Sequence, residues 1–283
     1  MEKDFIKNFE KKLKKTIKDH NLIKKSDKVI VACSGGKDST VLLYLLNKLG
    51  YKVVGLIIDL LVGTWSKKNL NNIQEFCKSN KIKLHVINIR DEIGSSICYV
   101  RSGIQSKVNL GNCTICGVIK RWLLNNKPRE LKADKIATGH NLDDAAETVL
   151  MNYMKGNPEL SIGLGPRTGV IKSKKFVQRI KPLYFFSNKE IKKYSQLHNF
   201  PVLYDPCPCS IGVFRRNIRE LLNLQEKKYP DIKLNIVNNF LEFLPKLKKK
   251  FISNKELNYC KLCGEPSRKE VCRKCSLIKI LKS

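Results

Sequence analysis

Helical repeats of apolar residues alternate along the chain with short apolar runs that are typical of strands. Over residues 4–20 apolar side chains recur every three or four positions, with lysines on the opposite face, which predicts an amphipathic helix. Residues 28–33 form a short run of mostly β-branched side chains, which predicts a buried strand. A helical pattern covers residues 40–49 soon afterwards. The chain therefore begins with a helix, a strand and a second helix.

The same alternation continues through the middle of the chain. We expect strands at residues 53–59, 83–88 and 134–138, and helices at residues 67–79, 115–131 and 143–154. This order favours an α/β fold with a doubly wound parallel sheet, because each helix returns the chain to the start of a parallel strand. The loops at the carboxyl ends of such strands form the ligand crevice.

The pattern is less regular beyond residue 155. A glycine-containing loop leads to a short strand near residues 176–180, and helices are expected at residues 187–198, 212–226 and 231–249. The last segment, from residue 257 onward, is rich in cysteine and in basic side chains. We expect a small separate module there.

The charge composition narrows the choice of partner. The 283 residues include 55 Lys and Arg against 25 Asp and Glu, a net charge of +30. Such a surplus favours a polyanion, most simply nucleic acid, over an anionic membrane surface. No apolar stretch approaches the roughly 20 residues of a membrane helix. The N-terminal residues lack the apolar region of a secretory signal, so we expect no membrane partner and a cytoplasmic location.

The turn after the first strand is the clearest candidate ligand site. Its residues are Ser34, Gly35, Gly36, Lys37, Asp38, Ser39 and Thr40. Glycines let backbone amides approach a ligand, and the amides at the start of a helix bind phosphate. The spacing differs from that of a Walker loop, and an ordinary strand-to-helix turn is the simpler alternative.

Other candidates follow the second and fourth strands. Ile58 and Asp59 end the second strand, and Gly139 follows the fourth. Asp143 and Asp144 then open a helix. Two adjacent carboxylates near bound phosphates suit Mg²⁺. Acidic residues are also common in the first turn of a helix for structural reasons, and both roles are compatible.

Two groups of cysteines indicate metal or redox chemistry rather than disulfides. Cys113 and Cys116 form a CxxC pair, and Cys207 and Cys209 lie far downstream. These residues fit a zinc site with Cys209 as the fourth ligand, a redox pair, or an iron–sulfur cluster with three cysteines. The three solitary cysteines are expected to be small buried side chains. They are Cys33, Cys77 and Cys98.

The second group lies in the C-terminal segment. It consists of two CxxC pairs eight residues apart, namely Cys260, Cys263, Cys272 and Cys275. This spacing is typical of a structural Zn²⁺ site, and four unrelated cysteines at this spacing are improbable. The surrounding sequence is basic, which is consistent with docking to RNA as well as with a role in folding alone.

Four motifs together resemble one enzyme family. They are SGGKDST at 34–40, GNCTICGVIKR at 111–121, GHNLDDAAET at 139–148, and DPCPCS followed by FRRNIR within 205–219. This set is similar to the iron–sulfur-dependent tRNA 2-thiouridine synthetases of the PP-loop ATP pyrophosphatase superfamily. The resemblance implies an adenine nucleotide alpha-hydrolase-like fold. It also implies a basic helix (1–25), a catalytic domain (26–225), a helical linker (226–256) and a zinc module (257–283).

The resemblance also implies a reaction and its cofactors. Cys113, Cys116 and Cys207 would hold a [4Fe–4S] cluster whose unliganded iron delivers sulfur, and Lys120 and Asp144 match positions of the activation site. The enzyme would use ATP and Mg²⁺ to adenylate the C2 oxygen of a tRNA uridine. Sulfur from sulfide, a persulfide or a ubiquitin-like thiocarboxylate protein would then displace AMP. A homodimer is expected by resemblance as well.

Two alternatives stay open at this stage. The first is another tRNA-acting ATP pyrophosphatase, of the 2-thiocytidine or lysidine type; a lysidine enzyme has no need of the three cluster cysteines. The second is a non-catalytic zinc protein that binds RNA, which has no need of a phosphate loop. Members of the resembling family commonly carry a further zinc finger at the N-terminus, where this chain has a lysine-rich helix. Its lysines, at 11, 12, 14, 15 and 18, form either a solvated face or an RNA-docking surface.

Overall fold

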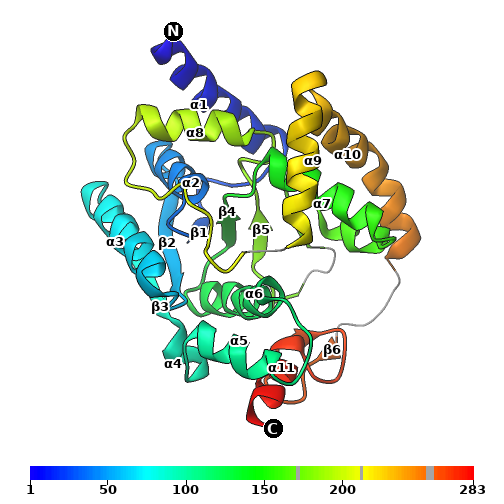
Figure 1. The fold of residues 1–283 in the computed structure, drawn as a ribbon. Helices are drawn as coiled ribbons and strands as arrows, with labels where there is room; N and C mark the ends of the chain where they lie inside the picture. Colours follow the sequence, from blue (N-terminus) through cyan, green and yellow to red (C-terminus); the bar gives the residue numbers. More distant parts are fainter. Residues whose placement is uncertain (170–172, 211–212, 253–257) are drawn as a thin grey trace.

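The centre of the molecule is a parallel sheet of five strands in the order β3-β2-β1-β4-β5. The computed structural model describes residues 1–169, 173–210, 213–252 and 258–283 (Figure 1). The strands are β1 (Lys28–Cys33), β2 (Lys52–Asp59), β3 (Leu84–Asn88), β4 (Lys135–Thr138) and β5 (Gln178–Ile180). The order changes direction between β1 and β4, so the ligand crevice of this fold lies between their carboxyl ends. The expected doubly wound parallel sheet is confirmed.

Residue register aligns the carboxyl ends of the central strands. Ala32 of β1 lies opposite Leu56 of β2 and Thr138 of β4. Val29, Ile30 and Val31 are completely buried, as expected for a central strand that is covered on both faces. The loops that follow β1, β2 and β4 therefore begin at one edge of the sheet.

Helices cover both faces of the sheet in three packed groups (Figure 1). The first core joins the sheet to α1 (Glu2–Asp19), α2 (Lys37–Lys48), α3 (Gly63–Ser79) and α8 (Asn188–Leu197). The second contains α4 (Ile89–Ile93), α5 (Ile97–Gln105), α6 (Asn112–Glu130) and α11 (Arg273–Lys282). The third contains α7 (Leu142–Met154), α9 (Phe214–Lys228) and α10 (Ile232–Phe251).

Every helix expected from the sequence is present, with boundaries shifted by a few residues. The start of α2 lies three residues earlier than expected because the glycine turn leads directly into the first helical residue, Lys37. The sequence pattern did not predict α4, α5, α11 or the 3-10 helix η1 (Pro158–Gly163). In α5, Gly103 and several β-branched side chains weaken the helical signal. Glycine is needed at position 103 because Leu281 of α11 packs directly against this residue and leaves no room for a side chain.

A buried acid joins α7 to α9. Glu147 is only 1% exposed, and both of its oxygens accept hydrogen bonds from Arg219. Arg215 donates to Glu147 as well, over 3.3 Å. These arginines belong to the FRRNIR motif, so the motif holds α9 against α7.

The C-terminal segment docks on α6. Glu265 is 7% exposed and accepts hydrogen bonds from Arg129 and from Asn125, both on α6. A small hairpin, β6 (Asn258–Tyr259) and β7 (Pro266–Ser267), precedes α11. The second core contains Leu277 of α11 and helices α5 and α6. This segment is therefore fixed to the helix that carries Cys113 and Cys116.

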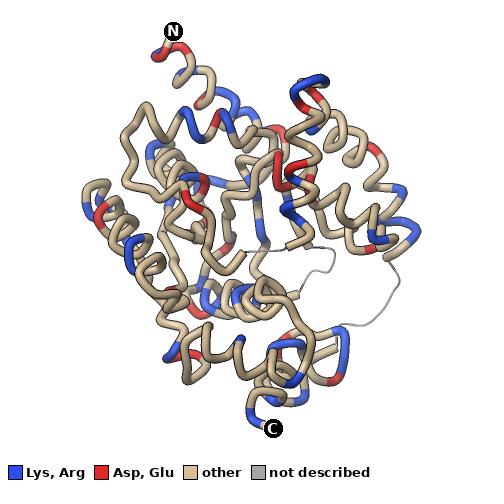
Figure 2. The backbone as a smooth tube through the Cα atoms, viewed as in Figure 1, with Lys and Arg blue, Asp and Glu red and all other residues tan. Residues whose placement is uncertain are grey.

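Basic side chains are spread over the fold, from the N-terminal helix to the C-terminal segment (Figure 2). On α1, Lys12 forms an ion pair of 2.8 Å with Glu190 of α8. The other lysines of the predicted stripe are exposed. No helix in the described ranges is long and apolar enough to cross a membrane.

We predict that Glu147→Gln destabilises the protein, because Arg215 and Arg219 would lose the negative charge with which they pair. A fully buried ion pair costs roughly 3–5 kcal/mol when one partner is removed. The arginines are partly exposed, so we expect a loss of about 2 kcal/mol in the free energy of unfolding, measured with urea. Glu220→Gln is the matched control, because Glu220 pairs with Arg216 on the exposed face of α9. Equal effects of the two substitutions would contradict the prediction.

Candidate active site

The loop after β1 has the geometry of a phosphate-binding turn. Gly35 adopts a φ of +79°, and an added Cβ would lie 2.6 Å from the side chain of Asn69. The hydroxyl of Ser39 donates to the carbonyl of Gly36 and accepts from the amide of Ser34. Thr40 Oγ1 also donates to the Gly36 carbonyl, over 3.1 Å. These bonds fix the loop and leave the amides at the start of α2 facing outward from the sheet edge.

The loop after β4 packs tightly against this turn. A Cβ on Gly139 would lie 2.8 Å from two backbone atoms, the carbonyl carbon of Asp38 and the nitrogen of Ser39. Asn141 donates to Asp38 Oδ1 over 2.9 Å, and Lys37 donates to Asp38 Oδ2 over 2.8 Å. Glycine is therefore required at 139 for the two loops to meet.

A cavity of about 220 Å³ opens beside the loop. It is lined by loop residues from Ser34 to Asp38, by Trp65 and Asn69 of α3, and by residues 203–205. The indole Nε1 of Trp65 is buried and has no hydrogen-bond partner among the described residues. It is thus a free donor beside the cavity. Ile58 and Asp59 end β2 at the same edge of the sheet but do not line this cavity.

The adjacent acids on α7 have separate partners. Asp143 is 8% exposed, and its two oxygens accept from Lys233 Nζ at 2.6 Å and from the amide of Asn188 at 2.7 Å. Asp144 caps its own helix through the amide of Asn141 and lies 3.7 Å from Arg215. A shared Mg²⁺ ion would require the Lys233 ion pair to open, and the assignment of both residues to Mg²⁺ stays a prediction.

Cations gather around Asp144. Burial lowers the pKa of Lys181 to about 8, although the charge of Asp144 opposes this effect. Burial, together with the neighbouring Arg121, lowers the pKa of Arg179 to about 10. Arg179 donates to the backbone carbonyl of Arg121 over 3.1 Å, and in the described ranges no carboxylate pairs with Arg179 or Lys181. Desolvation also lowers the pKa of His140, and the charge of Asp144 opposes this effect.

The structure brings together the cysteines of the two distant motifs. Burial raises the pKa of Cys116, the charges of Arg101 and Lys120 lower it, and those of Cys113 and Cys207 raise it. Burial likewise raises the pKa of Cys207, and Lys120 opposes this effect. Cys116 and Cys207 therefore lie in one electrostatic neighbourhood, together with the exposed Cys113 and Lys120. Lys120 lies one helical turn beyond Cys116, on the same face of α6.

Two further cysteines lie next to this group. The carbonyl of Cys209 accepts a hydrogen bond from Asn112, at the start of α6. Cys98 is exposed and accepts a hydrogen bond from Arg101, so its expected burial is wrong; Cys33 and Cys77 are buried, as expected. Arg101, Arg179 and Lys181 are not among the site residues predicted from the sequence. For Arg101 a signal was available, because it interrupts the apolar face formed by Ile97, Val100 and Ile104.

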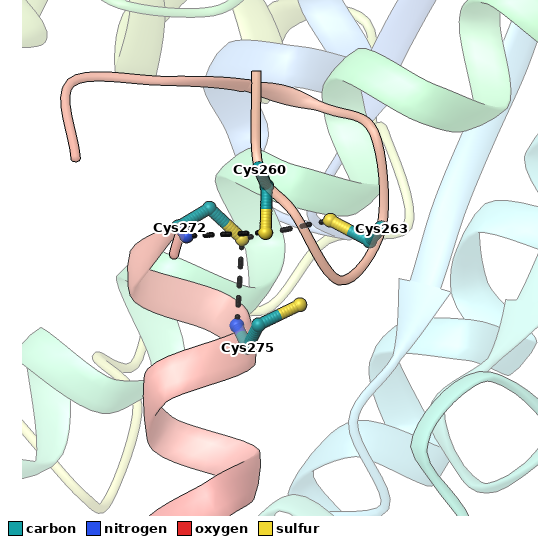
Figure 3. A group of neighbouring side chains, drawn as sticks. All are labelled: Cys260, Cys263, Cys272 and Cys275. Atoms are coloured by element: carbon teal, nitrogen blue, oxygen red, sulfur yellow. Dashed lines mark hydrogen bonds between the residues drawn. The ribbon is translucent and has the colours of Figure 1, made fainter. Parts of the chain in front are cut away.

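The C-terminal cysteines form a compact metal-binding geometry (Figure 3). The sulfurs of Cys260, Cys263, Cys272 and Cys275 all lie within 4.8 Å of one another. The amide of Cys272 donates to the sulfur of Cys260, and the amide of Cys275 donates to the sulfur of Cys272. Burial would raise the pKa of Cys260, but hydrogen bonds from the backbone amides of Cys272, Leu262 and Cys263 lower it to about 6. Four thiols at this spacing are suited to one tetrahedral metal ion.

Comparison with known proteins agrees with this architecture. The PP-loop domain family matches residues 5–226. The tRNA-5-methyluridine(54) 2-sulfurtransferase of Pyrococcus horikoshii is 34% identical over 97% of this chain and 86% of its own length. The cytoplasmic tRNA 2-thiolation protein 1 of Aspergillus niger is 32% identical over 97% of this chain and 80% of its own length.

A solved structure extends the similarity to three dimensions. The U34-tRNA thiolase NcsA from Methanococcus maripaludis with its [4Fe-4S] cluster has a TM-score of 0.82 and 30% sequence identity. The similarity covers 99% of this chain and 89% of that one. This chain belongs to the PP-loop family. Its relatives within that family are tRNA 2-sulfurtransferases and tRNA 2-thiolation proteins, which confirms the resemblance drawn from the four motifs.

We predict that Gly139→Ala disturbs the phosphate loop, because its Cβ must push against the backbone of α2. The expected loss is about 1–3 kcal/mol in the free energy of unfolding, as for overpacking in a core. Gly163→Ala is the control, since no atom lies within 4 Å of a Cβ at that position. It should change stability by less than about 0.5 kcal/mol. Urea titration of both variants measures the difference, and a neutral Gly139→Ala would show that the two loops can separate at little cost.

Proposed function

We propose that this chain is an ATP-dependent tRNA sulfurtransferase that replaces the C2 oxygen of a tRNA uridine with sulfur. One observation carries the proposal. Leu203 forms a β-bridge with Gly36 of the phosphate loop, and the same short segment continues through Tyr204 and Asp205, which line the cavity, to Cys207. The segment that carries a candidate sulfur-handling cysteine is thus bonded to the loop that binds phosphate.

The phosphate loop would bind ATP in the cavity beside α2. Backbone amides and the helix dipole at the start of α2 favour the phosphate chain, and the hydroxyls of Ser34 and Ser39 hold the loop in shape. The C2 oxygen of the uridine attacks the α-phosphate, and pyrophosphate leaves. A sulfur nucleophile then attacks C2, and AMP departs with the original oxygen. Adenylation is needed because a carbonyl oxygen is a poor leaving group.

Lys120 and the cations near Asp144 would act during activation. Negative charge accumulates on the α-phosphate as the uridine oxygen attacks, and a fixed cation stabilises that charge best in a site that excludes water. Lys120 lies beside Cys116 and Cys207, on the side from which sulfur must arrive. Asp144 holds Arg215 near the same edge of the sheet and keeps Lys181 charged.

The cysteine group suits a [4Fe–4S] cluster with three protein ligands. Thiolates from Cys113, Cys116 and Cys207 are the soft ligands that iron–sulfur clusters take, and two cations are present to balance their charge. A cluster bound in this way supplies one iron with no protein ligand, where exogenous sulfur can be held. The compact C-terminal group of four cysteines would hold a structural Zn²⁺.

Binding of tRNA at this site requires an unpaired base and a positively charged surface beside the site. Enzymes that modify a base reach it by extruding the nucleotide or by acting on a loop. The half-buried Arg179 donates to the backbone carbonyl of Arg121, and Arg273 of the C-terminal segment adds a further positive charge near Arg121. The activity belongs in the cytoplasm, as the name of the Aspergillus niger relative states for that protein.

The first test is anaerobic purification followed by metal analysis and a thiolation assay. We expect about four irons and one zinc per chain. With ATP, sulfide and tRNA, mass spectrometry of the digested tRNA should detect 2-thiouridine or 2-thio-5-methyluridine. Cys113→Ala should lose the iron and the product but keep the zinc, whereas Cys77→Ala, on the buried face of α3, should keep all three.

Two outcomes would refute the cluster-dependent mechanism. The first is thiolation that persists when Cys113, Cys116 and Cys207 are all replaced by alanine, because sulfur transfer would then be independent of the cluster. The second is wild-type protein with two zincs and no iron, because the cysteine group would then be a structural zinc site. If no ATP hydrolysis is detected in the presence of tRNA, the sulfurtransferase proposal fails and a passive RNA-binding protein is favoured.

We predict that Arg179→Gln weakens tRNA binding by about tenfold, since a charge-assisted contact to a phosphate contributes roughly 1.5–3 kcal/mol. The plot of log affinity against log salt concentration should become less steep by about one unit. Arg216→Gln is the control, because Arg216 is exposed and already paired with Glu220. ATP affinity should not change, and a loss of ATP binding instead of tRNA binding would place Arg179 at the nucleotide.

A further inference from the structure

Arg101 is a buried cation without an acidic partner. Its side chain lies on the packed face of α5, the residue is 7% exposed, and the neighbouring core residues Ile97, Val100 and Ile104 are completely buried. Within the described ranges no carboxylate lies within ion-pair distance of Arg101, and its Nε atom has no hydrogen-bond partner. Burial of an unpaired charge is costly, so a compensating negative group is expected at this position.

The groups that surround the guanidinium are sulfurs. Nη2 of Arg101 donates to Cys98 Sγ over 3.1 Å. Cys116 and Cys209 pack against the same core as Ile97, Val100 and Ile104, the neighbours of Arg101 on α5. Burial alone would lower the pKa of Arg101, but the sulfurs of Cys209, Cys116 and Cys98 raise it above its usual value. The guanidinium is therefore placed between α5 and the cysteine group at the start of α6.

Two neutral thiols do not explain a buried charge here. A thiol is a weak acceptor, and its bond to Arg101 does not offset the loss of hydration of a guanidinium. An iron–sulfur cluster with three thiolate ligands carries a net negative charge, and that charge increases by one on reduction. Such a group would compensate Arg101 fully, and Arg101 in turn would stabilise the more negative state of the group.

We propose that Arg101 is a positioning residue for the cluster, which retains the three-cysteine [4Fe–4S] group through its positive charge and favours its reduced state. The proposal rests on the proposed function, namely on a cluster at Cys113, Cys116 and Cys207. Arg101 differs in this from Lys120, whose side chain is exposed and whose charge is therefore screened by water and salt. Net charge and hydrogen bonds to sulfur are established determinants of cluster potential.

The test compares the reduction potential of the cluster in four proteins. They are the wild type, Arg101→Met, Arg101→Lys and the control Arg90→Met, whose arginine is exposed on α4. Anaerobic redox titration followed by electron paramagnetic resonance gives the midpoint potential, and iron and acid-labile sulfide give the occupancy. We expect a more negative midpoint in Arg101→Met, a smaller shift in Arg101→Lys, which keeps the charge, and no shift in Arg90→Met.

The inference fails if Arg101→Met has full iron occupancy and the wild-type midpoint, or if Arg101→Lys shifts as far as Arg101→Met. If Arg101→Met contains no iron, the melting temperatures of the metal-free proteins decide. If metal-free Arg101→Met melts at the same temperature as the metal-free wild type, the role of Arg101 is toward the cluster. An equal decrease of the melting temperature in the methionine and lysine variants would indicate a role in core packing and overturn the inference. Wild-type protein without iron would refute the proposed cluster itself, which is a different outcome from a loss of iron in Arg101→Met alone.

Discussion

The closeness of Gly139 to the first turn of α2 is the constraint on which the candidate active site depends. The backbones after β1 and β4 meet at a distance that excludes any side chain at position 139. This contact is possible because β1 and β4 are direct neighbours with aligned carboxyl ends. Asn141 then reaches Asp38, so the two loops form a single rigid edge to which the other parts of the site attach.

From this edge the contacts continue toward the cysteines. Gly36 bonds to Leu203, four residues before Cys207, and the FRRNIR helix that follows is held against α7 by Glu147. The loop that carries Cys207 is thus fixed at its start by the phosphate loop and beyond its end by an ion pair. Because α7 itself begins at the loop after β4, both attachments lead back to the same edge of the sheet. Nucleotide and cysteine sites are therefore parts of one framework.

Local patterns were sufficient to predict the sheet, most of its helices, the phosphate loop and the C-terminal cysteine group. These features depend on periodicity or on spacing within a few residues. Contacts between distant residues were not predictable: Asp143 is bound by Lys233, 90 positions away, and Arg101 is buried against cysteines of other segments. The exposure of Cys98 likewise depends on tertiary packing, because a cysteine in an apolar helix has no local feature that distinguishes buried from exposed.

The docking of Glu265 on Arg129 has a structural consequence. With 19 residues, α6 spans roughly 28 Å. Its first turn carries Cys113 and Cys116, and its last turns are clamped by the four-cysteine segment. The two sulfur-rich sites therefore share one helix, and loss of the C-terminal segment would uncover the end of α6 opposite to Cys113 and Cys116.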